Sequence, residues 1–131
     1  MNIDEAILKA ADHIERHPGS YLYTQGMVMR GKEGYGPGGY PSCMLARIGE
    51  YAGAATGTSH LQIAARLLGY VDGDVDFLKD IAAAGIDSYD DVKAIPAALR
   101  KYAKKYEGIP VPVRDIFNPA QFQKQFDEVT P

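Results

Sequence analysis

The chain has a single cysteine, Cys43, whose type and position suggest covalent chemistry. Residues 31–40 read GKEGYGPGGY and lead into Pro41 and Ser42, where we expect a helix to begin. The start of a helix carries unpaired N–H groups and a partial positive charge, which favour a thiolate or a bound anion. Free cysteine is also among the most buried residue types, so an inert thiol suits the same position. The sequence leaves both interpretations open.

One hypothesis is a cysteine-dependent hydrolase or transferase. Cys43 would be the nucleophile, and His60, at the start of the next predicted helix, would be the base. Gln25 would donate a hydrogen bond to an oxyanion, as side-chain amides do in such sites. In the alternative interpretation Cys43 packs in the core, His60 lies on the surface near a helix cap, and Gln25 bonds to the loop that follows it. The spacing of the three residues is not diagnostic, and we favour a protein that is not an enzyme.

A second group of residues predicts a binding surface around the glycine-rich loop. Tyrosine beside glycine and serine offers a large contact area with adaptable polar contacts. We therefore predict a small non-enzymatic interaction or ligand-binding module whose partner is an unidentified protein or small molecule. The alternative is that some of these tyrosines belong to the core and the others to an ordinary surface. The predicted binding residues are Tyr23, Gln25, Gly26, Tyr35, Gly38, Gly39, Tyr40 and Ser42.

Two further patterns are reminiscent of metal sites. Asp72, Asp74 and Asp76 match the first ligands of an EF-hand loop, but its required glycine and glutamate are missing. His13 and His17 are one helical turn apart and could share a metal, although no third ligand is in view. Acidic residues at a helix start and histidines at an exposed helix end explain both patterns more simply. We expect no metal and no cofactor.

Helical periodicity covers most of the chain. Asn2 and Glu5 predict a capping box for a first helix, which stops at the His-Pro-Gly of residues 17–19. Another helix should start near Ser42, and Ser59 with Gln62 predicts the capping box of the next. Further helices are expected from residue 74 to 85 and from 88 to 108, with an extended segment at 109–113 and a last short helix from 118. In the helix after Ser59 the residues expected to face inward are Leu61, Ala64, Ala65 and Leu68.

Residues 21–30 break this pattern because their side chains follow a period of two and include aromatic and β-branched residues, which predicts a strand. A lone strand is not stable, so residues 35–40 are its expected partner in a hairpin. The predicted fold is therefore mainly α (α+β), with five or six short helices and one small β-hairpin.

The bulk properties fit one globular domain of 131 residues with 46% hydrophobic residues and a net charge of −3. The negative charge argues against a nucleic-acid partner. No segment is apolar enough to span a membrane, and a single cysteine fits the reducing cytoplasm. Residues 109–131 form a C-terminal arm rich in phenylalanine, and a second copy of the chain is a candidate partner for it.

Two short motifs carry a resemblance to a known family. Tyr23-Thr24-Gln25-Gly26 precedes the loop and Cys43-Met44-Leu45 follows it. Their order resembles an uncharacterised family of small bacterial and phage domains, which carry Trp-x-Gln-Gly and then Cys-Ala-Leu-Gly-Ala. The resemblance covers about residues 3–105, and the chain departs from the motifs at Tyr23, Met44 and Ala46. It implies a bacterial or phage origin and directs attention to Gln25, Gly26 and Cys43, but it carries no activity.

Overall fold

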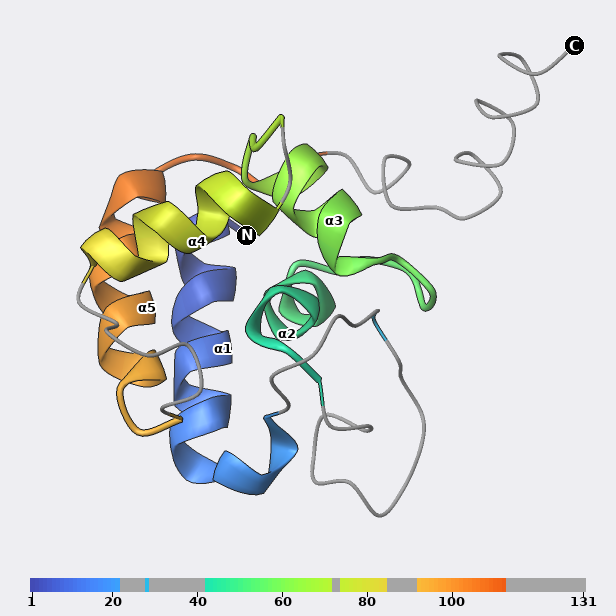
Figure 1. The fold of residues 1–131 in the computed structure, drawn as a ribbon. Helices are drawn as coiled ribbons and strands as arrows, with labels where there is room; N and C mark the ends of the chain where they lie inside the picture. Colours follow the sequence, from blue (N-terminus) through green and yellow to red (C-terminus); the bar gives the residue numbers. More distant parts are fainter. Residues whose placement is uncertain (22–27, 29–41, 72–73, 85–91, 113–131) are drawn as a thin grey trace, which may run out of the picture.

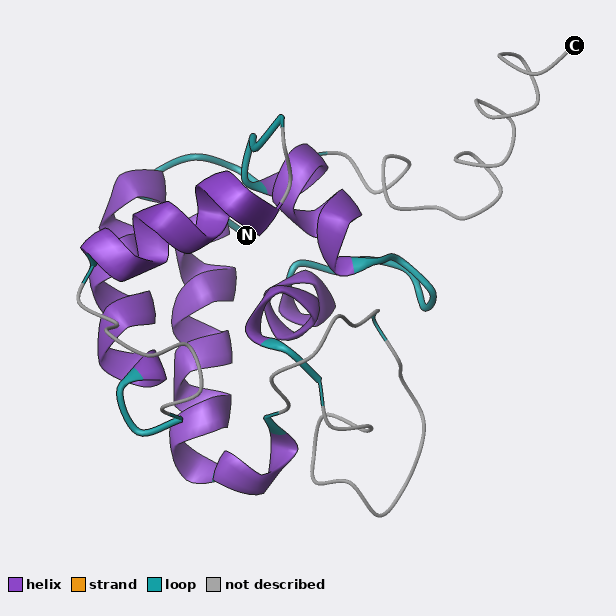
Figure 2. Ribbon diagram, in the orientation of Figure 1, coloured by secondary structure: helices purple, strands orange, loops and turns teal. Residues whose placement is uncertain are grey.

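The computed structural model describes residues 1–21, 28, 42–71, 74–84 and 92–112 (Figure 1). Within these residues the chain is helical and contains no strand (Figure 2), which confirms the mainly helical prediction. The predicted hairpin of residues 21–30 and 35–40 lies almost entirely outside the described residues. The α-helices are α1 (Ile3–Arg16), α2 (Met44–Tyr51), α3 (His60–Gln62), α4 (Asp74–Ala83) and α5 (Ile95–Ala103). Shorter turns are η1 (Pro18–Ser20), the π-helical η2 (Ile63–Leu67) and η3 (Lys104–Tyr106).

Helix α1 begins where the sequence predicts. The Asn2 backbone N–H donates to Glu5 Oε1 at 3.2 Å, which is one half of the expected capping box. The helix ends at His17, immediately before the proline of η1. One face of α1 is buried along its whole length by Ile3, Ala6, Ile7, Ala10, Ala11, His13 and Ile14.

Helix α1 is the centre of the fold. Helix α5 runs antiparallel beside it, α2 packs on another side, and α4 lies across the same end of α1 and α5 (Figure 1). The first and last described segments are also joined: Ile3 N–H donates to the Ile109 carbonyl at 2.7 Å, and Val111 N–H donates to the Met1 carbonyl at 3.0 Å. The core is therefore closed around α1 by elements from the end of the described chain.

The turn after α3 differs from the predicted helix. The Leu68 N–H donates to the Ile63 carbonyl at 3.2 Å, an i→i+5 bond of a π-helix that adds a residue to the turn. The buried positions 60, 63, 64, 67 and 68 nevertheless recur at ordinary helical spacing, one residue out of phase with the predicted set. The expectation that Leu61 and Ala65 face inward is wrong, because Leu61 is 49% exposed and Ala65 is exposed as well.

Helix α2 approaches this turn closely at Gly49. A Cβ at position 49 would lie 2.3 Å from Ile63 Cδ1 and 3.3 Å from Val28 Cγ2. All three residues are buried, so the contact requires the absence of a side chain at this position.

Helix α5 carries Pro96 in its first turn, where the missing N–H of proline breaks no helical hydrogen bond. Its far end holds a chain of hydroxyl groups: Tyr70 and Tyr102 are 2.7 Å apart, Tyr102 and Tyr106 are 2.7 Å apart, and Tyr106 donates to the Leu68 carbonyl. Lys105 Nζ lies over the three rings and bonds to Asp80. Burial raises the pKa of the Tyr70 and Tyr102 hydroxyls, so both are protonated at pH 7, and the Tyr70 hydroxyl donates to the ionised Asp80 of α4.

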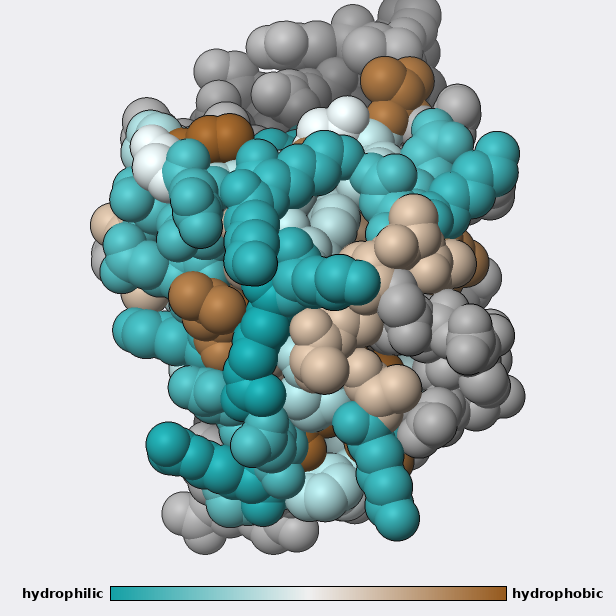
Figure 3. Space-filling view, turned by 90° about the vertical axis from the view of Figure 1, so that its left-hand side faces the viewer, coloured by the Kyte–Doolittle hydropathy of each residue, from teal (hydrophilic) through white to brown (hydrophobic). Residues whose placement is uncertain are grey.

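The face on the α5 side of the molecule is mainly hydrophilic, with hydrophobic residues in separate small areas (Figure 3). Among the described helices none combines the length and apolar character that a membrane crossing requires.

Candidate functional site

The predicted nucleophile Cys43 is a capping residue in the core. It lies immediately before α2, and its Sγ accepts a hydrogen bond from the Ala46 backbone N–H at 3.5 Å. The residue is only 3% exposed. Of the two arrangements that the sequence leaves open, this position matches the buried thiol.

The predicted base His60 is the first residue of α3, after the capping box that Ser59 and Gln62 form as expected. The alternative expectation that His60 lies on the surface is wrong, because the packing of α3 against α2 leaves it 7% exposed. Ser42 is partly buried, and its backbone N–H donates to the Ser20 carbonyl. The other predicted residues, Tyr23, Gln25, Gly26, Tyr35, Gly38, Gly39 and Tyr40, lie outside the described residues.

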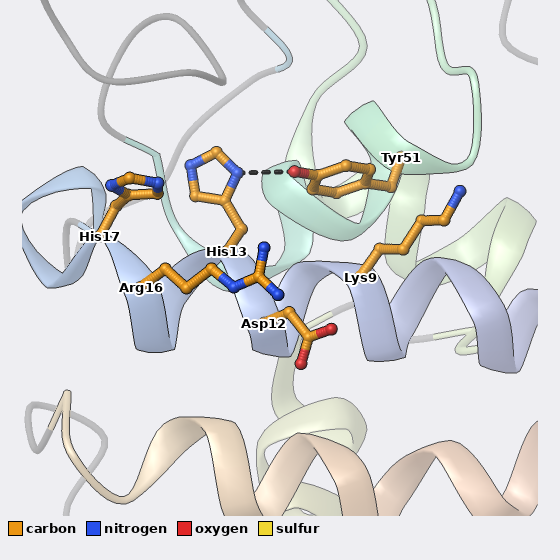
Figure 4. Close-up of a pocket in the computed structure, with 6 residues that line it drawn as sticks. All are labelled: Lys9, Asp12, His13, Arg16, His17 and Tyr51. Carbon is orange, nitrogen blue, oxygen red and sulfur yellow. Dashed lines mark hydrogen bonds between the residues drawn. The ribbon is translucent and has the colours of Figure 1, made fainter.

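A cleft of about 280 Å³ lies elsewhere, between the C-terminal half of α1 and the end of α2 (Figure 4). Neither Cys43 nor His60 lines it. Four of its residues come from α1, a fifth is the C-cap that follows this helix, and the sixth is the last residue of α2. The cleft is lined by Lys9, Asp12, His13, Arg16, His17 and Tyr51.

His13 is the most buried residue of this cleft at 4% exposure. Its Nδ1 shares a hydrogen bond of 2.7 Å with the Tyr51 hydroxyl (Figure 4). Burial and the positive charge of Arg47 lower the pKa of His13 from 6.5 to about 4, and burial raises the pKa of Tyr51. Both groups are therefore neutral at pH 7. The prediction that His13 sits at an exposed helix end is wrong, because α2 places Tyr51 over it.

The second nitrogen of the His13 ring has no hydrogen-bond partner in the described part of the chain, although it is buried. This Nε2 lies on the side of the ring that faces His17 (Figure 4). The two imidazoles meet edge to face, with ring centroids 5.5 Å apart. A buried polar atom without a partner costs folding free energy, so such an atom in a cleft is a candidate ligand contact.

The charges around the cleft are unevenly paired. Asp12 forms an ion pair with Arg100 on α5, and the buried Arg47, which does not line the cleft, pairs with Glu50. Within the described residues Lys9 and Arg16 form no ion pair, and their side chains are exposed at the rim of the cleft. The rim therefore offers two positive charges above a neutral histidine and a tyrosine hydroxyl.

Sequence reasoning missed this site except for the spacing of His13 and His17. Lys9, His13 and Arg16 recur at helical spacing beside the apolar stripe of α1, which is a signal that could have marked a polar face. Tyr51 gave no such signal, because in the sequence it continues the apolar stripe of α2.

Comparison of the chain with family models, with curated proteins and with solved structures finds no match in any of the three.

Proposed function

We propose that the protein is a small non-enzymatic binding module, and that the cleft between α1 and α2 binds the anionic group of its ligand. The ligand class is a small molecule or a chain end that carries a carboxylate or a phosphate. The predicted binding surface around the glycine-rich loop, with its hairpin, remains part of the proposal as a second contact region. Its predicted residues other than Ser42 lie outside the described part of the chain.

The observation that carries the proposal is a buried, unpartnered histidine nitrogen in a cleft whose rim holds two cations without ion pairs. When His13 Nδ1 accepts the hydrogen of the Tyr51 hydroxyl, Nε2 carries the ring proton and donates to the anion; the tautomer with the proton on Nδ1 does not bind an anion in this way. A carboxylate or phosphate accepts hydrogen bonds from several donors at once, and bonds between charged groups are the stronger kind. Lys9 and Arg16 supply positive charge at the rim, and the Tyr51 hydroxyl supplies a neutral polar group. Asp12 does not cancel this charge, because Arg100 pairs with it.

The alternative is a cysteine-dependent hydrolase or transferase that uses Cys43, His60 and Gln25. The helix start at Cys43 is present, and the Ala46 N–H already bonds to its Sγ. A nucleophile also needs access for its substrate, and 3% exposure of Cys43 offers little. This favours the binding module over the enzyme.

A titration with inorganic phosphate and with succinate tests the proposal and separates the two anion classes. We expect the backbone amide resonances of the cleft residues to shift in the NMR spectrum, with a dissociation constant of about 1–10 mM for such simple probes. Lys9→Glu and Arg16→Glu should each weaken binding at least threefold. Lys101→Glu, which changes an exposed cation of α5 outside the cleft, is the matched control for net charge.

Equal weakening by Lys101→Glu would show that net charge alone attracts the anion. Shifts confined to residues outside the cleft, or no shifts with either probe, would contradict the proposal.

A further inference from the structure

We propose that His13 and His17 together bind a divalent transition-metal ion such as Zn²⁺ at the end of this cleft. The inference shares residues with the proposed anion site but does not require an anionic ligand, and the experiment below separates the two.

The positions of the imidazoles support a shared metal. His17 N–H donates to the His13 carbonyl at 2.9 Å, so the two residues are held one helical turn apart. Their ring centroids are 5.5 Å apart, and His13 Nε2 lies on the side facing the His17 ring (Figure 4). Two imidazoles on one tetrahedral zinc, each with Zn–N of about 2.0–2.1 Å, place their centroids at about this separation.

The partner of His13 Nδ1 prepares Nε2 for this role. Histidines that bind metals almost always donate their other ring N–H to an outer group, which fixes the tautomer and the ring orientation. The Tyr51 oxygen is in place to accept that hydrogen bond from Nδ1. His13 Nε2 is then unprotonated, and it is the nitrogen that is buried without a partner. A metal bound at Nε2 would explain both the hydrogen bond from Nδ1 to Tyr51 and the buried nitrogen that has no partner in the described residues.

The remaining coordination positions are open. Within the described residues no group of three His, Cys, Asp or Glu side chains is placed to hold a metal. Water, or the anionic group of a ligand in the cleft, would therefore complete the coordination, as in zinc sites that keep open positions. Imidazole ligands select zinc, copper and nickel over magnesium and calcium, which prefer oxygen. Lys9 and Arg16 carry charge of the same sign as the metal and limit its affinity.

Titration of the metal-free, untagged full-length chain with Zn²⁺ tests the inference, with Mg²⁺ as the control cation. The imidazole nitrogen resonances of His13 and His17 should shift with Zn²⁺ and not with Mg²⁺. His60 lies outside the cleft, so its resonances are the internal control and should stay in place. In calorimetry His17→Ala, which changes an exposed side chain, should weaken binding at least tenfold. Tyr51→Phe keeps both ligands and should weaken binding about 10-fold or more through the loss of the outer hydrogen bond.

Unchanged zinc affinity in His17→Ala would overturn the inference, as would zinc shifts at His60 alone. His13→Ala is a supporting variant only if it folds, and His17→Ala decides the question without it. Repeating the phosphate and succinate titrations with a chelator present separates the two proposals. Anion binding that persists with the chelator, together with no zinc shifts, would leave the anion site standing and remove the metal site. Zinc binding without anion binding would leave the metal site standing and remove the anion site.

Discussion

Replacement of His13 by glutamine should remove a large part of the acid sensitivity of the fold. Burial and Arg47 lower the pKa of His13 in the folded protein from 6.5 to about 4. Between these two values the unfolded chain binds a proton that the folded chain does not. The contribution to stability is therefore complete above pH 6.5 and is lost as the pH falls toward 4. A shift of this size corresponds to about 3 kcal/mol of unfolding free energy.

Urea denaturation at several pH values between 7.5 and 4, with a chelator present, measures this effect. The wild type should lose about 3 kcal/mol more than His13→Gln over this range. Carboxylates titrate in both proteins, so their contribution cancels in the difference. The charged and titratable groups around His13, namely Lys9, Arg16, His17, Arg47 and Tyr51, are also unchanged in the variant.

His17→Gln is the control, because its exposed side chain should leave most of the wild-type acid loss in place. Equal acid loss in wild type and His13→Gln would refute the reasoning. It would mean that His13 is protonated as easily in the folded protein as in the unfolded chain.

Two further predictions concern α2. Gly49→Ala should lower the free energy of unfolding by about 1–3 kcal/mol, because its Cβ would meet Ile63 Cδ1 in a packed core. Adding Ile63→Val, which removes that atom, should restore part of the lost stability. Gly19→Ala is the control and should cause no such loss, because no atom lies within 4 Å of its Cβ. If Gly19→Ala destabilised the protein as much as Gly49→Ala does, the packing argument would be contradicted. Iodoacetamide should label the buried Cys43 slowly until denaturant is added. Cys43→Ser should lower the free energy of unfolding by about 1–3 kcal/mol, because it buries a hydroxyl. Rapid labelling of the native protein that depends on His60 would instead favour the cysteine enzyme.

Local rules were enough to predict where several helices begin. The capping boxes at Asn2 and Ser59 act over three residues, so a sequence contains all the information they need. The same holds for the end of the first helix, where Pro18 follows the C-cap His17.

The parts that sequence reasoning missed depend on contacts between distant residues. His13 is buried because Tyr51, from another helix, covers it, and no local pattern contains that information. The inward face after α3 was assigned one residue out of phase, because the predicted set and the buried set both have helical spacing and periodicity alone does not choose between them. Gly49 was missed for a similar reason, since the side chain that it accommodates, Ile63, belongs to a turn that folds back on α2. The cleft depends on the contact between α1 and α2, so the sequence predicted its histidine spacing and not its location.

The closing of the core around α1 has a consequence for biosynthesis. Helix α1 leaves the ribosome about 90 residues before the end of α5 that packs along it. At roughly 5–20 residues per second, translation delays that partner by about 5–20 s. Throughout this interval the apolar stripe of α1, which includes Ile3, Ile7 and Ile14, has no α5 to cover it. The nascent chain therefore exposes this apolar stripe until α5 has been synthesised, and the pairing of α1 with α5 is a late step of its folding.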